Sequence, residues 1–348
     1  MKKTFSLLLI ASLVISANAQ FNAEKTPLVT KSLSTENIKD ILAKTSGGSI
    51  SVTGVSASEA KIEVYVVPNN YRKNDLSESE IRQRMASDYK LTLEISNNKL
   101  TAIAEPKDRN MDWKKSLNFS FKIFVPKNVS TDLSTSGGSI TLKNLAGVLK
   151  FGTSGGSLNV EEVTGKIDGR TSGGSIHLEN SRAEEVELST SGGSIDARNS
   201  EGKLRLTTSG GSLNLRDLKG DIKATTSGGS VNGKNISGEL VTHTSGGSIH
   251  LEELYCSLET STSGGNIDVS IKEPGKYVRI SNSAGSIDLE LPKNKGLTLD
   301  FSADRIRTDQ LENFTGKVED DRIEGKLNGG GSTVKVDAGS GRIHLKLK

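Results

Sequence analysis

One set of side chains in this sequence has the types and the spacing for acid–base chemistry. His250, Asp268 and Asp288 occur 18 and 20 residues apart, at the same place in successive copies of a repeat. If each copy forms one coil of a stack, the three side chains lie in a column with neighbours roughly 5 Å apart. Two carboxylates near that distance could hydrolyse a glycosidic bond with retention, or hold a metal ion. The alternative is a solvent-facing polar column without chemistry, since His177 and His344 occupy the same slot in distant copies.

Three arginines form a second candidate set. Arg305, Arg322 and Arg342 each precede an isoleucine in worn C-terminal copies of the repeat, and stacking would bring their guanidinium groups together. Such a stack could bind an anion such as a sugar acid. Asp304 and Asp321 directly precede the first two arginines, and local neutralisation by these carboxylates is the structural alternative.

The sequence lacks the residues that several other functions require. Cys256 is the only cysteine, so no disulfide framework forms within the chain, and the alternatives are an incidental thiol or a bond between two chains. A net charge of +3, from 45 basic and 42 acidic residues, gives no electrostatic case for nucleic acid. The glycine pairs precede Ser and a strand, without the Lys and helix of a phosphate loop. We therefore expect no catalytic residues, no cofactor and no metal.

The feature that would position these side chains is a short repeat. Thr-Ser-Gly-Gly-Ser followed by Ile, Leu or Val starts at Thr45 and recurs from Thr135 to Thr244, with variants at Thr262 and Asn282. From Thr135 onward the steps are 18, 18, 19, 18, 18, 18, 18 and 20 residues. So regular a period indicates one supersecondary unit stacked on itself. The glycine pairs predicted to form one corner of each coil are Gly137, Gly138, Gly155, Gly156, Gly173, Gly174, Gly192, Gly193, Gly210, Gly211, Gly228, Gly229, Gly246, Gly247, Gly264 and Gly265.

Each corner is followed by an alternating apolar pattern. Ile140 and Leu142 enclose one polar residue, and the same arrangement recurs in later copies, which indicates a strand with one buried face. A second alternating stretch begins with Leu149 and Phe151, after a turn rich in Asn, Asp and Gly, which tolerate left-handed backbone angles. Because like residues recur at like places, stacking pairs each strand with its counterpart in the next coil. We predict an all-β fold, a single-stranded parallel β-solenoid (β-helix) of about 18 residues per coil.

Two columns refine this prediction. The first Thr of each repeat continues the alternation and should face inward, which excludes ice or mineral binding by a threonine face. Lys166, Glu185, Lys203 and Asp221 form an outer column that alternates in sign, so vertical neighbours would attract by a few tenths of a kcal/mol.

Two known repeat architectures do not fit. Calcium-binding nonapeptide coils need Gly-Gly-x-Gly-x-Asp, but here Ile, Leu or Val fills the last glycine slot. The aspartate slot is acidic only at Asp196, Asp268 and Asp288. Hexapeptide acyltransferases need three equal sides, whereas the inward positions five, seven, fourteen and sixteen show no such spacing. Neither a calcium roll nor a hexapeptide acyltransferase is expected.

The first residues are typical of an export signal. Residues 1–19 contain Lys2 and Lys3, an apolar stretch over 5–15 and a small-residue cleavage site ending at Ala19. No later segment is long and apolar enough to span a bilayer. We predict a mature chain without a transmembrane segment that is periplasmic, cell-surface or secreted.

The mature chain divides into three parts. Residues 20–134 are predicted to form the solenoid start or cap, with an insertion around 68–116 whose short helix opens at a capping box over 77–80. The alternative for this part is a separate small domain. Residues 135–300 form the regular repeat solenoid, and 301–348 form degenerate C-terminal coils.

The N-terminal part also contains recognisable pieces. Residues 45–67 look like one coil, and a cap is expected from the side chains of Trp113, Phe119 and Phe121. The segments predicted as strands in the same part are 91–95, 100–104 and 117–125.

The repeated Thr-Ser-Gly-Gly-Ser-Ile-x-Leu, approached through Phe-Val-Pro-Lys at 124–127 and Leu-Ser-Thr at 133–135, resembles a bacterial family. It is the β-strand-repeat domain of unknown function whose members carry the name "putative adhesin", and the resemblance covers about residues 45–348. The resemblance implies a single-stranded parallel β-solenoid, an envelope or surface setting and no catalytic residues.

The sequence thus predicts a non-catalytic exported β-solenoid. We expect an adhesin or cell-envelope scaffold that binds through long repetitive faces, with surface glycans, matrix proteins or other envelope components as partners, because a repeating surface offers many equivalent weak contacts. The alternative is a polysaccharide-processing β-helix enzyme that uses the His250, Asp268 and Asp288 stack. An aromatic content of only 4% and one nearly constant coil length count against an enzyme cleft.

Overall fold

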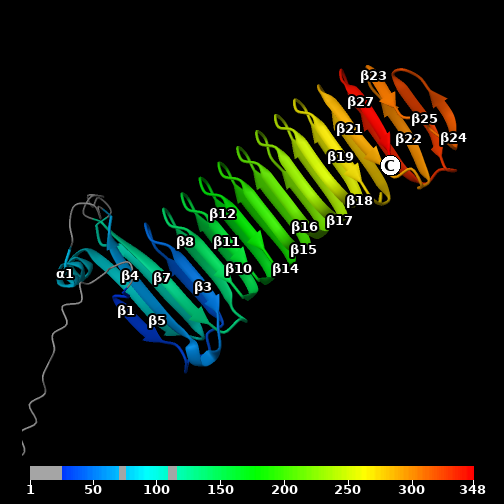
Figure 1. Cartoon of the computed structure of the whole chain (residues 1–348). Helices are drawn as coiled ribbons and strands as arrows, with labels where there is room; N and C mark the ends of the chain where they lie inside the picture. Colours follow the sequence, from blue (N-terminus) through cyan, green and yellow to red (C-terminus); the bar gives the residue numbers. More distant parts are fainter. Residues whose placement is uncertain (1–25, 70–75, 109–115) are drawn as a thin grey trace, which may run out of the picture.

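The computed structural model describes residues 26–69, 76–108 and 116–348, which form one long stack of β-coils (Figure 1). The described residues contain twenty-seven strands in a single hydrogen-bonded network, and along the middle of the stack these strands pair in parallel. The predicted parallel β-solenoid is therefore confirmed. Within the described residues no helix is long and apolar enough to cross a membrane. The export signal predicted over residues 1–19 lies outside the described residues.

The regular coils stack like residue on like residue. Leu158, for example, pairs with Ile140 in the coil before it and with Ile176 in the coil after it. The strands of this part are β8 (Ser130–Thr135), β9 (Ile140–Lys143), β10 (Ala146–Thr153), β11 (Leu158–Glu161), β12 (Thr164–Thr171), β13 (Ile176–Glu179), β14 (Arg182–Thr190), β15 (Ile195–Thr208), β16 (Leu213–Thr225), β17 (Val231–Thr244), β18 (Ile249–Thr262), β19 (Ile267–Ile271), β20 (Tyr277–Asn282) and β21 (Ser286–Leu291).

The core contains one more inward column than the alternation predicts. After Asn144, whose φ of 54° turns the chain through the left-handed region, Leu145 points inward and is fully buried. Its counterparts in later coils are Val163, Ser181, Ser200, Leu218, Ile236 and Leu254. The two serines interrupt the apolar pattern, which is why the sequence conceals this column.

The threonine that opens each repeat is buried and joins two coils. Thr153 Oγ1 donates to the carbonyl oxygen of Gly138 in the preceding coil at 2.8 Å, and accepts from the Gly156 N–H at 3.3 Å. The same pair of bonds recurs at later coils. The inward threonine is thus confirmed, with glycine carbonyls and amides as its partners.

In the coils from Thr135 onward, packing requires only the second glycine of each pair. A Cβ atom on Gly211 would overlap the carbonyl oxygen of Gly193 in the coil before it, whereas one on Gly210 would meet nothing closer than 3.6 Å. In the worn repeat near the C-terminus, Ala284 fills the first slot and Gly285 keeps the second.

At the N-terminal end, the order of the strands in the stack differs from their order in the sequence. Strands β2 (Asp40–Lys44) and β3 (Ile50–Gly54) form a coil that pairs directly with β8 and β9, although 75 residues separate Gly54 from Ser130 in the sequence. The strands of that intervening part that pair with this coil lie on its other side. There β2 pairs with β6 (Lys99–Pro106) and β3 with β7 (Leu117–Val125).

Antiparallel strands cover this end of the stack. Strand β4 (Lys61–Pro68) runs antiparallel to β7 and to β1 (Val29–Ser32), so the coil expected over 45–67 ends at Gly54. Strand β5 (Tyr89–Ser96) forms a hairpin with β6. A short 3-10 helix, η1 (Ala57–Glu59), and α1 (Glu78–Asp88) complete this part.

The predicted helix start and part of the predicted cap are present. Ser77 caps α1, and its backbone N–H donates to Glu80 at 2.8 Å in a complete capping box. Phe119 and Phe121 are buried, and the Tyr89 and Phe119 rings lie 4.9 Å apart between centroids. Trp113 lies outside the described residues.

The C-terminal end also departs from chain order. Strands β26 (Ser332–Asp337) and β27 (Arg342–Leu347) lie between the β20–β21 coil and the coil of β22 (Leu297–Ser302) and β23 (Arg305–Thr308). Strands β24 (Phe314–Val318) and β25 (Arg322–Leu327) form an antiparallel hairpin, and β25 is antiparallel to β22. The degenerate coils expected in succession over 301–348 are therefore rearranged, with the last coil inside the stack. One continuous hydrophobic core extends from Leu28 to Leu345.

Candidate functional site

The predicted acid–base column is present on the outer face of the sheet. His250 on β18, Asp268 on β19 and Asp288 on β21 occupy successive register positions. His250 Nδ1 lies 3.1 Å from Asp268 Oδ2. His344 joins the column, because β27 lies beside β21, and its Nδ1 is 3.2 Å from Asp288 Oδ1. The expectation that His344 is distant is wrong, since the insertion of the last coil could not be read from spacing.

This column consists of two separate hydrogen-bonded His–Asp pairs. Each aspartate contacts one histidine, and the four side chains are 43 to 59% exposed on an open sheet. A general acid for glycoside hydrolysis needs a desolvated carboxyl, which such exposure does not provide. In the described part of the chain, no group of three or more His, Cys, Asp or Glu side chains could hold a metal ion.

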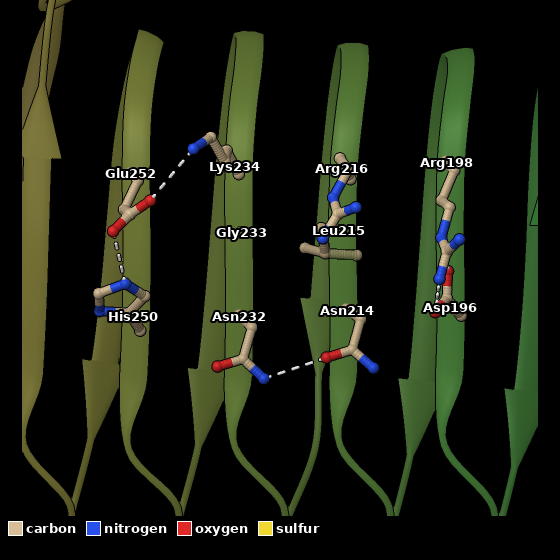
Figure 2. Close-up of a pocket in the computed structure, with 10 residues that line it drawn as sticks. All are labelled: Asp196, Arg198, Asn214, Leu215, Arg216, Asn232, Gly233, Lys234, His250 and Glu252. Carbon is tan, nitrogen blue, oxygen red and sulfur yellow. Dashed lines mark hydrogen bonds and ion pairs between the residues drawn. The ribbon is translucent and has the colours of Figure 1, made fainter.

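A shallow hollow of about 330 Å³ lies next to this column, over strands β15 to β18 (Figure 2). Two rows of outward side chains line this hollow, which we call the basic hollow, and each row takes one residue from each of four successive coils. The first row is Asp196, Asn214, Asn232 and His250, and the second is Arg198, Arg216, Lys234 and Glu252. Leu215 and Gly233 lie between the rows, and both are buried. The short amides in the middle of the first row leave the space open.

The outer cations of the basic hollow have carboxylate partners. Arg198 is held by both oxygens of Asp196, at 2.6 and 2.8 Å, and this carboxylate raises the pKa of the guanidinium. Lys234 Nζ lies 3.6 Å from a carboxylate oxygen of Glu252 and of Glu253. The hydrogen bond from His250 to Glu252, at 2.9 Å, lowers the pKa of Glu252.

The central cation is different. Arg216 lies between Arg198 and Lys234 in the parallel register, and among the described residues no carboxylate pairs with it. Beside it, Asn232 Nδ2 donates to Asn214 Oδ1 at 3.0 Å, so Nδ2 of Asn214 remains available as a donor (Figure 2). The sequence does not reveal this site, because isolated Arg, Asn and Lys are common in outer columns and only their register brings them together.

The predicted stack of three arginines is wrong. Arg305 and Arg342 are register partners on β23 and β27. Arg322 lies apart from them on β25, opposite Ser302, and pairs with Glu324 at 3.1 Å. The antiparallel hairpin of β24 and β25, which the repeat spacing does not reveal, separates it from the other two.

Cys256 is enclosed in the turn column, in register with Gly238. It is 2% exposed, and burial raises the pKa of its thiol to about 12. This position favours the incidental thiol over a bond between two chains.

Part of the chain matches a known family. Residues 234–346 match the family model described as Toastrack DUF4097. The match confirms the family resemblance suggested by the repeat. The matched residues include the whole His–Asp column. From the basic hollow they include Lys234, His250 and Glu252.

Two solved structures are similar over most of the chain. A putative cell adhesion protein from Clostridium sporogenes ATCC 15579 is 13% identical, with 92% of this chain and 98% of that chain covered and a TM-score of 0.20. A putative adhesin from Bacteroides fragilis NCTC 9343 is also 13% identical, with coverages of 92% and 96% and a TM-score of 0.26. At these TM-scores neither structure bears on the residues of the site. A comparison with curated proteins found no match.

Proposed function

We propose that this protein is a non-catalytic exported β-solenoid that binds extended partners through its outer faces, as an adhesin or a scaffold of the cell envelope. The observation that carries this proposal is the parallel register, in which outward side chains recur at the same slots along the stack. Adjacent slots are about 4.8 Å apart, so a polymer along the stack meets many weak contacts that add up.

The division of labour within each coil supports a binding role. The threonine of the motif makes hydrogen bonds between coils, and the second glycine packs against the backbone of the preceding coil, so neither is available to a partner. The outward columns are free to differ from coil to coil, and they hold the open polar clusters. Contacts to a partner would therefore come from these variable columns.

The exposure of the His–Asp column weighs against the polysaccharide-processing enzyme. Its four side chains lie on a flat sheet, where water has free access. Transition-state stabilisation by charged groups is far weaker in such a setting than in a closed cleft.

An array of glycans and matrix proteins, combined with a sugar-release assay, tests the proposal. The full chain and its Asp268→Ala and Asp221→Ala variants are compared. Asp221 is a matched control, because it is an exposed aspartate in another outer column. We expect binding without sugar release, equal for all three proteins. Sugar release that Asp268→Ala alone abolishes would establish the enzyme instead, and binding to no array component would contradict the adhesive role.

A further inference from the structure

We infer that the basic hollow over β15 to β18 is a subsite for the carboxylate of an acidic glycan, with Arg216 as its central ligand. The inference rests on the proposed binding role and names the chemistry of the partner. It follows from the charge balance, the donor geometry and the boundaries of the basic hollow.

The charge balance leaves one cation without compensation. Three lining residues are cationic, namely Arg198, Arg216 and Lys234, against the two carboxylates of Asp196 and Glu252. The two carboxylates lie at the outer coils, where they pair with Arg198 and Lys234. Arg216, in the middle, has no carboxylate partner among the described residues, whereas the cations on both sides of it are paired. A ligand oxyanion placed there completes the pairing.

The donors suit a carboxylate. The planar guanidinium of arginine presents two parallel N–H groups that match the two oxygens of a carboxylate. Asn214 Nδ2, on the same strand as Arg216, offers another donor from the neighbouring row. The outward lining consists of amides, guanidinium groups, an ammonium, an imidazole and carboxylates, without an outward apolar side chain. Such a lining suits the hydroxyls of a sugar better than the side chains of a peptide.

The row of Arg198, Arg216 and Lys234 is followed by a carboxylate at each end. Glu179 is the register partner of Arg198, and Glu252 is the register partner of Lys234. A polymer with a negative charge on every unit would meet one of these carboxylates within two coils of Arg216. A glycan that presents one uronate, with neutral sugars over the neighbouring coils, avoids that repulsion. The basic hollow thus favours isolated or widely spaced over dense negative charge.

Calorimetric titration of the full chain with the hyaluronan disaccharide, in which one uronate is joined to one neutral sugar, tests the inference. The comparison probes are polygalacturonate, neutral dextran and poly-L-glutamate, each at low and physiological salt. Arg216→Gln should lower the affinity for this disaccharide by roughly tenfold or more, since a charged hydrogen bond is lost. Arg216→Lys should have an intermediate affinity. Lys223→Gln is the matched control, because Lys223 is an exposed cation on the same strand that does not line the basic hollow.

The possible outcomes separate this inference from the proposed function. Equal loss in Arg216→Gln and Lys223→Gln would mean general charge attraction, and tighter binding of poly-L-glutamate would mean a peptide site. Tighter binding of polygalacturonate would overturn the argument for spaced charge. If the protein binds a neutral glycan or a matrix protein but no acidic glycan, this inference fails and the adhesive role stands.

Discussion

The buried threonine of each repeat holds two coils together with one hydroxyl. It donates to a glycine carbonyl of the preceding coil and accepts from an amide of its own corner. At the worn repeat Asn282 takes its place: its Nδ2 donates to the Gly265 carbonyl at 2.8 Å, and its Oδ1 accepts from the Ala284 N–H at 3.2 Å. Asparagine is tolerated there because its amide supplies both a donor and an acceptor.

Thr131 is the contrasting case, because its buried hydroxyl finds no hydrogen-bond partner within the described part of the chain. Its register partners are Ile41 and Leu149, both apolar. We expect Thr131→Val to raise the free energy of unfolding by about 1 kcal/mol, since an unsatisfied buried hydroxyl is removed at constant shape. Urea denaturation measures this change. The control Thr153→Val, which breaks bonds that are made, should lower stability by a similar amount, and a loss in both variants would contradict the assignment.

The thiol of Cys256 should be inert in the folded protein. Burial raises its pKa to about 12, so almost no thiolate exists near neutral pH. We expect iodoacetamide at about pH 8 to leave the native chain unmodified and to alkylate it fully in urea, as measured by mass spectrometry. Equal rates of alkylation in both conditions would show that the thiol is accessible.

At the scale of the element, the glycine corner decides how closely two coils approach. A side chain on the second glycine collides with the backbone below it, and one on the first does not. We expect Gly211→Ala to cost about 2 kcal/mol or more, and Gly210→Ala to change stability by less than about 1 kcal/mol. Urea denaturation of the two variants makes a matched comparison. Equal effects would mean that the corner relaxes freely.

The strands of the regular coils follow from alternation, and so could be predicted residue by residue. Ile140 and Leu142 signal one buried face, and apolar residues recur at both positions in the other copies except at Gly233. The column of Leu145 could not, because a left-handed residue reverses the phase of the alternation and serines occupy two of its places. The place of strand β25 is hidden for a related reason: its Arg-Ile pair imitates the repeat, while its pairing is antiparallel.

At the scale of the whole molecule, both ends of the solenoid are closed by insertion. The first coil lies between β8–β9 and β6–β7, and the last coil lies between β20–β21 and β22–β23. The candidate sites were predictable only where stack order follows chain order. His250 and Asp268, in successive coils, were found by spacing, whereas His344 is 56 residues from Asp288 and meets it through the inserted coil.

Removal of residues 332–348 tests the role of the last coil. Without β26 and β27, the coil of β22 and β23 loses its parallel partners. We expect residues 297–327 to become sensitive to protease, and residues 135–262 to remain as protected as in the full chain, because contacts in a solenoid are made with nearest neighbours. Limited proteolysis with mass spectrometry measures both. Unchanged protection of 297–327 would show that β22 needs no inner partner.

The inserted last coil also affects how the protein would respond to mechanical force. A terminal coil at the open end of a solenoid can be peeled away along a single line of hydrogen bonds. A pull on Lys348 acts first on β27, which is bonded to β21 on one side and to β23 on the other. The hydrogen bonds to β21 and those to β23 must break together before β27 can be pulled out of the stack. The last strand therefore resists force with two sets of hydrogen bonds.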